Sequence, residues 1–155
     1  MNNLCADIGY KSIYHYGEEL CGDHVDIVEQ NENSTVIVLA DGLGSGVKAS
    51  ILSTLTSKII STMMAAGLPL EECVSTIAAT LPVCSVRGVA YSTFTIMHIK
   101  DNETAEIIQY DNPHVILIRD NISCDYPKNE MNIDGKRIYK STVKPYCIFQ
   151  KVLPL

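Results

Sequence analysis

Two aspartates and a glycine-rich loop are the residues of this chain whose types and spacing could do chemistry. Asp23 lies in GDHVDIVEQ, and Asp41 lies further along in LADGLGSG, directly before Gly42. Carboxylate oxygens are the ligands that hard divalent cations prefer, and a glycine after Asp41 leaves its own carbonyl open to a metal. The pair therefore predicts a divalent-cation site if the side chains meet. The alternative, in which Asp41 only caps a helix and Asp23 is an exposed turn residue, stays open on spacing alone.

The glycine loop also invites nucleotide-binding interpretations, and its spacing disfavours them. A dinucleotide fingerprint needs a third glycine where Val47 stands, and Asp41 would place a carboxylate beside the pyrophosphate. A P-loop needs Ser or Thr after Lys48, but Ala49 follows it. Ser45 lies one place off the pattern of a nucleophile elbow. A nucleotide-binding domain is therefore kept only as a residual hypothesis.

The spacing of apolar residues predicts the elements that must position the aspartates. Residues 19–29 and 35–41 indicate two antiparallel strands joined by the polar turn QNENS. Residues 47–66 and 70–81 carry apolar residues at helical spacing, so both predict helices. Further strands are expected at 90–100, 104–110, 114–120 and 136–143. This order predicts an α+β fold with mainly antiparallel sheet.

The composition limits the class of protein to which this chain can belong. The 155 residues are 46% hydrophobic, which predicts a single domain over residues 1–155. No apolar run approaches the roughly 18 residues of a membrane span, and the first residues do not resemble a signal peptide. The six cysteines form no CxxC pair, so reduced thiols in a cytoplasmic protein are expected. With no tryptophan and no aromatic platform, nucleic acid is not an expected partner.

Four ordered motifs resemble the PPM family of metal-dependent protein phosphatases, in the bacterial branch typified by the phosphatase domain of stage II sporulation protein E. The motifs are GDHVDIVEQ, LADGLGSGVKAS, AYSTFTIMHI and YDNPHVILIRD. In that branch a GD precedes DGxGxG by the spacing that separates Asp23 from Asp41. Asn112, Pro113 and His114 match the family's GNP- or GHP-like turn. The resemblance covers roughly residues 4–145.

The resemblance implies a fold and a function. The fold is an α-β-β-α sandwich of two mainly antiparallel sheets flanked by helices, and the reaction is hydrolysis of phosphoserine or phosphothreonine by a metal-activated water. Asp23 and Asp41 take the catalytic role of holding a binuclear Mn²⁺ or Mg²⁺ centre, to which Gly42 offers its carbonyl. The implied partners are a phosphoprotein substrate, such as an anti-sigma-factor antagonist in sigma-factor regulation, and a second copy bound through the helices after residue 46.

The C-terminal part of the chain departs from the family pattern. The family's remaining metal carboxylates come from an SDG-like strand end and a later aspartate, whereas no acid follows Asp134 here. The last 21 residues carry five basic residues and read VKPYCIFQKVLPL at their end. We therefore expect a domain that is incomplete at its C-terminal end and holds metal weakly, because fewer carboxylates neutralise less charge. The alternative hypothesis is a non-catalytic PPM-like signalling or binding module.

Overall fold

The computed structural model describes residues 5–14, 16–82, 85–86, 92–144 and 147–149. In chain order its elements are β1 (Asp23–Asn31), β2 (Ser34–Gly42), α1 (Gly46–Ala65), α2 (Leu70–Thr80), β3 (Ser92–Lys100), β4 (Thr104–Tyr110), β5 (Ile116–Arg119), β6 (Ile122–Cys124), β7 (Asn129–Ile133), β8 (Lys136–Val143) and β9 (Cys147–Phe149). No helix among these residues is long and apolar enough to cross a membrane. The expected α+β class is confirmed.

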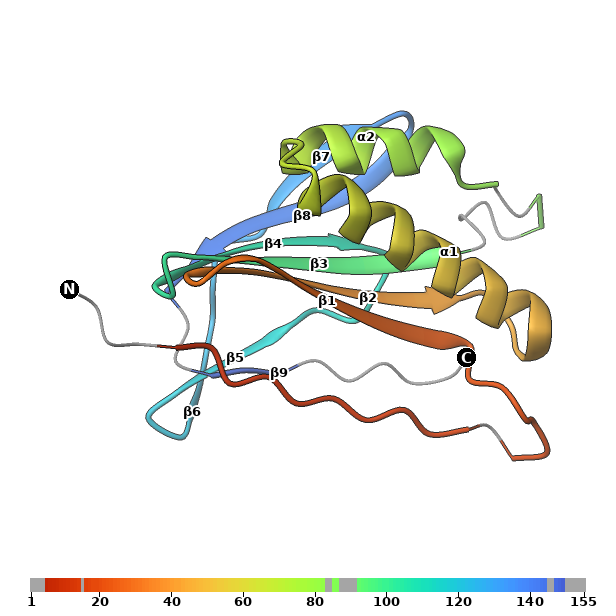
Figure 1. Cartoon of the computed structure of the whole chain (residues 1–155), viewed down its shortest axis with the longest axis horizontal. Helices are drawn as coiled ribbons and strands as arrows, with labels where there is room; N and C mark the ends of the chain where they lie inside the picture. Colours follow the sequence, from red (N-terminus) through yellow and green to blue (C-terminus); the bar gives the residue numbers. More distant parts are fainter. Residues whose placement is uncertain (1–4, 15, 83–84, 87–91, 145–146, 150–155) are drawn as a thin grey trace.

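The strands form two sheets. Six of them make an antiparallel sheet in the order β1-β2-β3-β4-β8-β7, and a smaller sheet has the order β6-β5-β9. Both helices cover one face of the large sheet, and the small sheet lies on the other side (Figure 1). The described residues therefore form three layers, of which the middle one is the large sheet. They cover only part of the sandwich that the resemblance implies.

Two apolar clusters hold these layers together. The first lies between the helices and the large sheet, and its largest buried side chains are Phe94, Ile60, Met64, Ile77 and Ile96. The second joins β4 and β8 to the small sheet through Ala105, Ile107, Val115, Leu117, Tyr126 and Val143. Alternate residues of β4 belong to different clusters because successive side chains of a strand point to opposite faces.

Most predicted elements are present, with corrections at their ends. The strand expected at 19–29 begins only at Asp23, and the strand expected at 114–120 is confined to Ile116–Arg119. The short strands β6, β7 and β9 were not predicted. Residues 90–91 of the expected strand 90–100 lie outside the described residues.

Helix α1 has an unusual division of polar and apolar residues. Its buried face consists of Ala49, Ser53, Thr56, Ser57, Ile60, Ser61 and Met64. By contrast, Val47, Ile51 and Leu55 are 62%, 59% and 51% exposed. These three apolar residues in the first half of the helix therefore lie on its outer face, whereas Ile59 and Met63 further along pack against the core.

The polar inner face of α1 is explained by the edge strand β1. His24 Nδ1 lies 2.8 Å from Ser57 Oγ, and Ser61 Oγ donates to Asp26 Oδ2 over 2.5 Å. Lys58 Nζ donates to Asp26 Oδ1 over 3.0 Å. Burial opposes ionisation of Asp26, but the hydrogen bonds from Ser61 and Lys58 outweigh it and keep the pKa of Asp26 below its ordinary value. These directional hydrogen bonds therefore hold α1 in place against β1.

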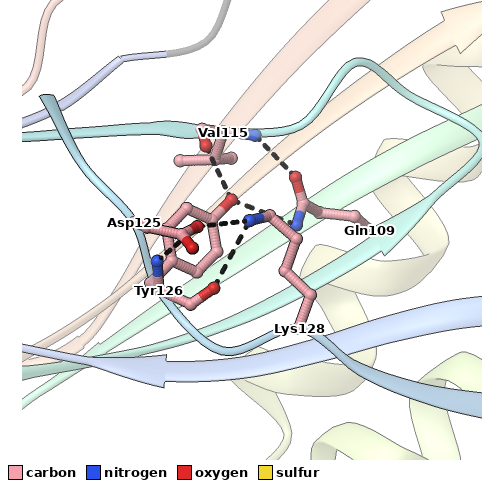
Figure 2. A network of polar contacts seen from close by, with 5 residues as sticks. All are labelled: Gln109, Val115, Asp125, Tyr126 and Lys128. Carbon is pink, nitrogen blue, oxygen red and sulfur yellow. Dashed lines mark hydrogen bonds and ion pairs between the residues drawn. The ribbon is translucent and has the colours of Figure 1, made fainter.

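A polar network, buried at Gln109, Val115 and Tyr126, connects the large sheet to the chain that enters the small one (Figure 2). Gln109 Oε1 accepts the backbone N–H of Val115 over 2.7 Å, and the Tyr126 hydroxyl donates to the Val115 carbonyl over 2.6 Å. Gln109 Nε2 donates to the same hydroxyl over 3.5 Å. Lys128 Nζ contacts the Tyr126 ring at 4.0 Å from its centroid and bonds Asp125 over 3.3 Å. The network fixes the position of Val115 beneath β4.

Replacing Tyr126 by phenylalanine tests this network. The variant leaves the buried Val115 carbonyl and the Gln109 amide without the hydroxyl, so we expect a loss of about 1 to 3 kcal/mol in the free energy of unfolding. Urea unfolding followed by circular dichroism measures it. Tyr10→Phe is the matched control because Tyr10 is 65% exposed. Equal effects of the two variants would contradict a role for the buried hydroxyl.

Candidate metal centre

The β1–β2 hairpin brings the two aspartates together. Asp23 opens β1 and Asp41 lies near the end of β2, and the antiparallel register places their Cα atoms opposite each other. The residues that alternate with Asp41, namely Val38 and Ala40, are fully buried on the helix side, so the aspartates occupy the opposite face of the sheet. Their carboxyl groups are close enough that Asp23 raises the pKa of Asp41. The hairpin therefore assembles the pair, and its role as a metal ligand stays a prediction.

The environment of Asp41 strongly disfavours the ionised form of its carboxyl group. Partial burial, the hydrogen bond with Asp23 and the charge of Asp23 together raise the pKa of Asp41 from 3.8 to about 7. Two adjacent carboxylates repel each other when both are ionised. A proton or a cation between them removes this repulsion.

Gly42 allows α1 to pack directly behind the aspartates. A Cβ atom added at Gly42 would lie 2.1 Å from the backbone oxygen of Ala49, in the first turn of α1. The Gly42 N–H donates to the Gly22 carbonyl over 2.9 Å and ties the strand end to the segment before β1. Only a residue without a side chain fits at this position.

The loop after Gly42 settles what caps the helix. The helix begins at Gly46 and its N-cap residue is Ser45, so the alternative in which Asp41 only caps a helix is wrong. Ser45 Oγ donates to Glu18 Oε1 over 3.0 Å and accepts no capping hydrogen bond from the backbone N–H groups of the helix. The backbone at Gly44 and Gly46 has φ of 92° and 75°, the left-handed region that favours glycine. The glycines therefore shape the turn from strand to helix.

The sequence analysis assigned no role at the site to Thr93 or Asn112, although Asn112 stands in the turn that matches the family. Thr93 lies opposite Asp41 in the register of β2 and β3. Its hydroxyl donates to Asn112 Oδ1 over 2.5 Å, and Asn112 Nδ2 donates to Thr95 Oγ1 over 3.2 Å. The alternating threonines and the DNP turn were the available signals, but a threonine in a strand needs no catalytic explanation.

The donor set fits a hard divalent cation. The converging groups are carboxylate oxygens with a hydroxyl beside them, which suits Mg²⁺ or Mn²⁺ better than Zn²⁺. His24 does not join them because its ring bonds Ser57 of α1. Across the part of the chain that the structure describes, no group of three or more His, Cys, Asp or Glu side chains could hold a metal. Asp23 and Asp41 would therefore hold a cation together with water.

Comparison with known proteins identifies the family. Residues 31–133, more than half of the chain, match the family of stage II sporulation protein E (SpoIIE). This chain belongs to the SpoIIE family. No curated protein matched the sequence significantly.

Solved structures share the fold of this SpoIIE-family chain. The PP2C phosphatase domain of SpoIIE from Bacillus subtilis, solved with a fragment of its regulatory domain, has a TM-score of 0.71 at 16% identity and is matched over 86% of this chain and 40% of that one. RsbX in complex with magnesium has a TM-score of 0.65 at 20% identity, over 87% and 66% of the two chains. A bacterial serine phosphatase has a TM-score of 0.56 at 15% identity, over 92% and 69%. This chain thus spans 40% and 66% of the first two proteins.

Proposed function

We propose that this SpoIIE-family domain is a metal-dependent phosphatase that hydrolyses phosphoserine or phosphothreonine in a protein. The observation that carries the proposal is the pairing of Asp23 with Asp41 in the β1–β2 register, beside the glycine loop and on the sheet face away from the helices, where Asp23 raises the pKa of Asp41. Membership of the SpoIIE family and the fold shared with RsbX, solved with magnesium, support it.

Residues of this chain would position the cation and the strand end that holds it. Asp23 and Asp41 hold the cation, and Gly42 lets α1 pack closely enough to fix the strand end that carries Asp41. A bound Mn²⁺ or Mg²⁺ supplies an activated water and stabilises charge on the phosphoryl group. With two carboxylates in the described part of the site, we expect weak metal binding and slow turnover.

The partners follow from the same family. The substrate is a phosphoprotein of a regulatory system, such as an anti-sigma-factor antagonist. A homodimer through the helices after residue 46 is supported by the exposed apolar residues Val47, Ile51 and Leu55 along α1, since large exposed apolar surfaces mark interfaces.

Hydrolysis of p-nitrophenyl phosphate and of a phosphoserine peptide tests the function. We expect turnover that requires Mn²⁺ and falls at least about 100-fold in Asp41→Ala, because the variant removes half of the carboxylate pair. Asp7→Ala, at an exposed position, is the matched control and should retain full activity.

The second candidate is a non-catalytic module, favoured by the small number of carboxylates in the described site. Mn²⁺ binding without turnover at saturating metal would support the module and contradict the phosphatase. Stabilisation by NAD or ATP in the absence of metal would instead revive nucleotide binding.

A further inference from the structure

Four polar residues form a continuous row across one face of the large sheet. Asp23 pairs with Asp41 in the β1–β2 register, and Asp41 pairs with Thr93 in the β2–β3 register. After β4 ends at Tyr110, the backbone of Asp111 turns with φ of 51°. Asn112 follows this turn, and its amide reaches back to Thr93. Residues from four segments of the chain therefore meet at the strand ends.

The single hydrogen of the Thr93 hydroxyl determines the direction of its hydrogen bond with Asn112. The Thr93 hydroxyl has one hydrogen to donate. Its oxygen, Oγ1, lies 2.5 Å from Asn112 Oδ1 but 3.5 Å from the Asp41 carbonyl oxygen. The much shorter distance commits the hydrogen to Asn112. Asn112 is only 9% exposed, and its Nδ2 donates to Thr95 Oγ1 over 3.2 Å. The amide is therefore held at both ends.

This direction determines what Thr93 can offer to the aspartates. With its hydrogen given to Asn112, Oγ1 has only lone pairs left, so its further contacts must be as an acceptor. The row then presents the Thr93 hydroxyl and the two carboxylates as neighbouring acceptors. A water molecule on a cation can donate to such a group, whereas an ionised carboxylate cannot.

We propose that Thr93, oriented by Asn112, is a positioning residue of the metal centre whose hydroxyl accepts a hydrogen bond from a water on the cation held by Asp23 and Asp41. This inference rests on the proposed function, because it requires a cation at the aspartate pair. Outer partners of this kind orient the groups around a metal and commonly change its affinity by about 10- to 100-fold.

Calorimetric titration with Mn²⁺ tests the inference without relying on turnover. We expect Thr93→Val, which is nearly isosteric, to weaken Mn²⁺ binding by about tenfold, and Thr93→Ser to bind within about threefold of the unmodified chain. Water proton relaxation of the bound Mn²⁺ should change in Thr93→Val and be restored in Thr93→Ser. Thr142→Val, on an exposed position of β8, is the matched control and should bind normally.

A second substitution separates orientation from folding. Asn112→Ala keeps the hydroxyl but frees its hydrogen to turn toward the aspartates, so we expect Mn²⁺ binding to weaken by about tenfold here also. If the Thr93→Val variant no longer unfolds cooperatively, Mn²⁺ binding by the Asn112→Ala variant tests the inference instead. Normal Mn²⁺ binding by both variants, with binding lost in Asp41→Ala, would overturn the positioning role and leave the phosphatase proposal intact. Absence of Mn²⁺ binding by the unmodified chain would overturn both.

Discussion

Gly42→Ala is expected to destabilise the protein by about 3 kcal/mol, at the upper end of the cost of overpacking. The added Cβ would lie 2.1 Å from the Ala49 oxygen and 2.6 Å from its carbonyl carbon. These are backbone atoms in the first turn of α1, so no side-chain rotation relieves the clash. Either the helix start or the end of β2 must move. We expect a lower midpoint of urea unfolding and weaker Mn²⁺ binding, because Asp41 is the neighbouring residue.

Gly22→Ala is the control for this substitution. Gly22 bonds Gly42 through its carbonyl, yet a Cβ at Gly22 would meet its nearest atom, Ala49 Cβ, at 3.4 Å. That distance is ordinary van der Waals contact, so we expect a change of less than about 1 kcal/mol. Equal stability of the Gly42→Ala variant and the unmodified chain would show that α1 is not packed as closely as the structure indicates.

Asp41→Asn is expected to stabilise the metal-free protein at pH 8 while it abolishes the response to Mn²⁺. The pKa of Asp41 is raised from 3.8 to about 7 in the folded chain, so the folded state binds a proton more tightly than the unfolded state. This contribution to stability is fully present below pH 3.8 and is lost as the pH rises through about 7. The asparagine is neutral throughout and does not repel Asp23.

Thermal unfolding in EDTA from pH 4 to pH 8 measures this effect. Because the Asp41 side chain is only partly buried, solvent screening reduces the full value of the shift, and we expect a gain of about 1 to 2 kcal/mol at pH 8. Added Mn²⁺ should raise the Tm of the unmodified chain and leave that of the variant unchanged. A variant that is less stable than the unmodified chain at pH 8 in EDTA would contradict the repulsion between the aspartates.

The parts of the fold that could be predicted from sequence are those set by local pattern. The polar turn between β1 and β2 predicts an antiparallel hairpin, and a hairpin is sufficient to bring Asp23 and Asp41 together. Helices α1 and α2 follow from apolar spacing and from Gly67 and Pro69 between them. Strands β6 and β7 were missed because ISC and NEMNI are so short that each offers only two alternating apolar residues, too few to stand out as a strand pattern.

Other features depend on contacts between distant residues and could not be read from local pattern. The proximity of Thr93 to Asp41 requires the β2–β3 register, which brings together residues 52 positions apart. The polar residues on the buried face of α1 could not be predicted for a similar reason. Ser57 and Ser61 are buried because β1 presents His24 and Asp26 to them, and apolar periodicity alone contains no information about a polar partner.

The hydroxyl-lined inner side of α1 has a mechanical consequence. Hydrogen bonds tolerate only a narrow range of lengths, and Asp26 bonds both Lys58 and Ser61 while Ala49 rests against Gly42. Moving the helix along its axis by one residue would break these contacts simultaneously. The contacts therefore define a single register of α1 on the β1–β2 hairpin in which all of them form together.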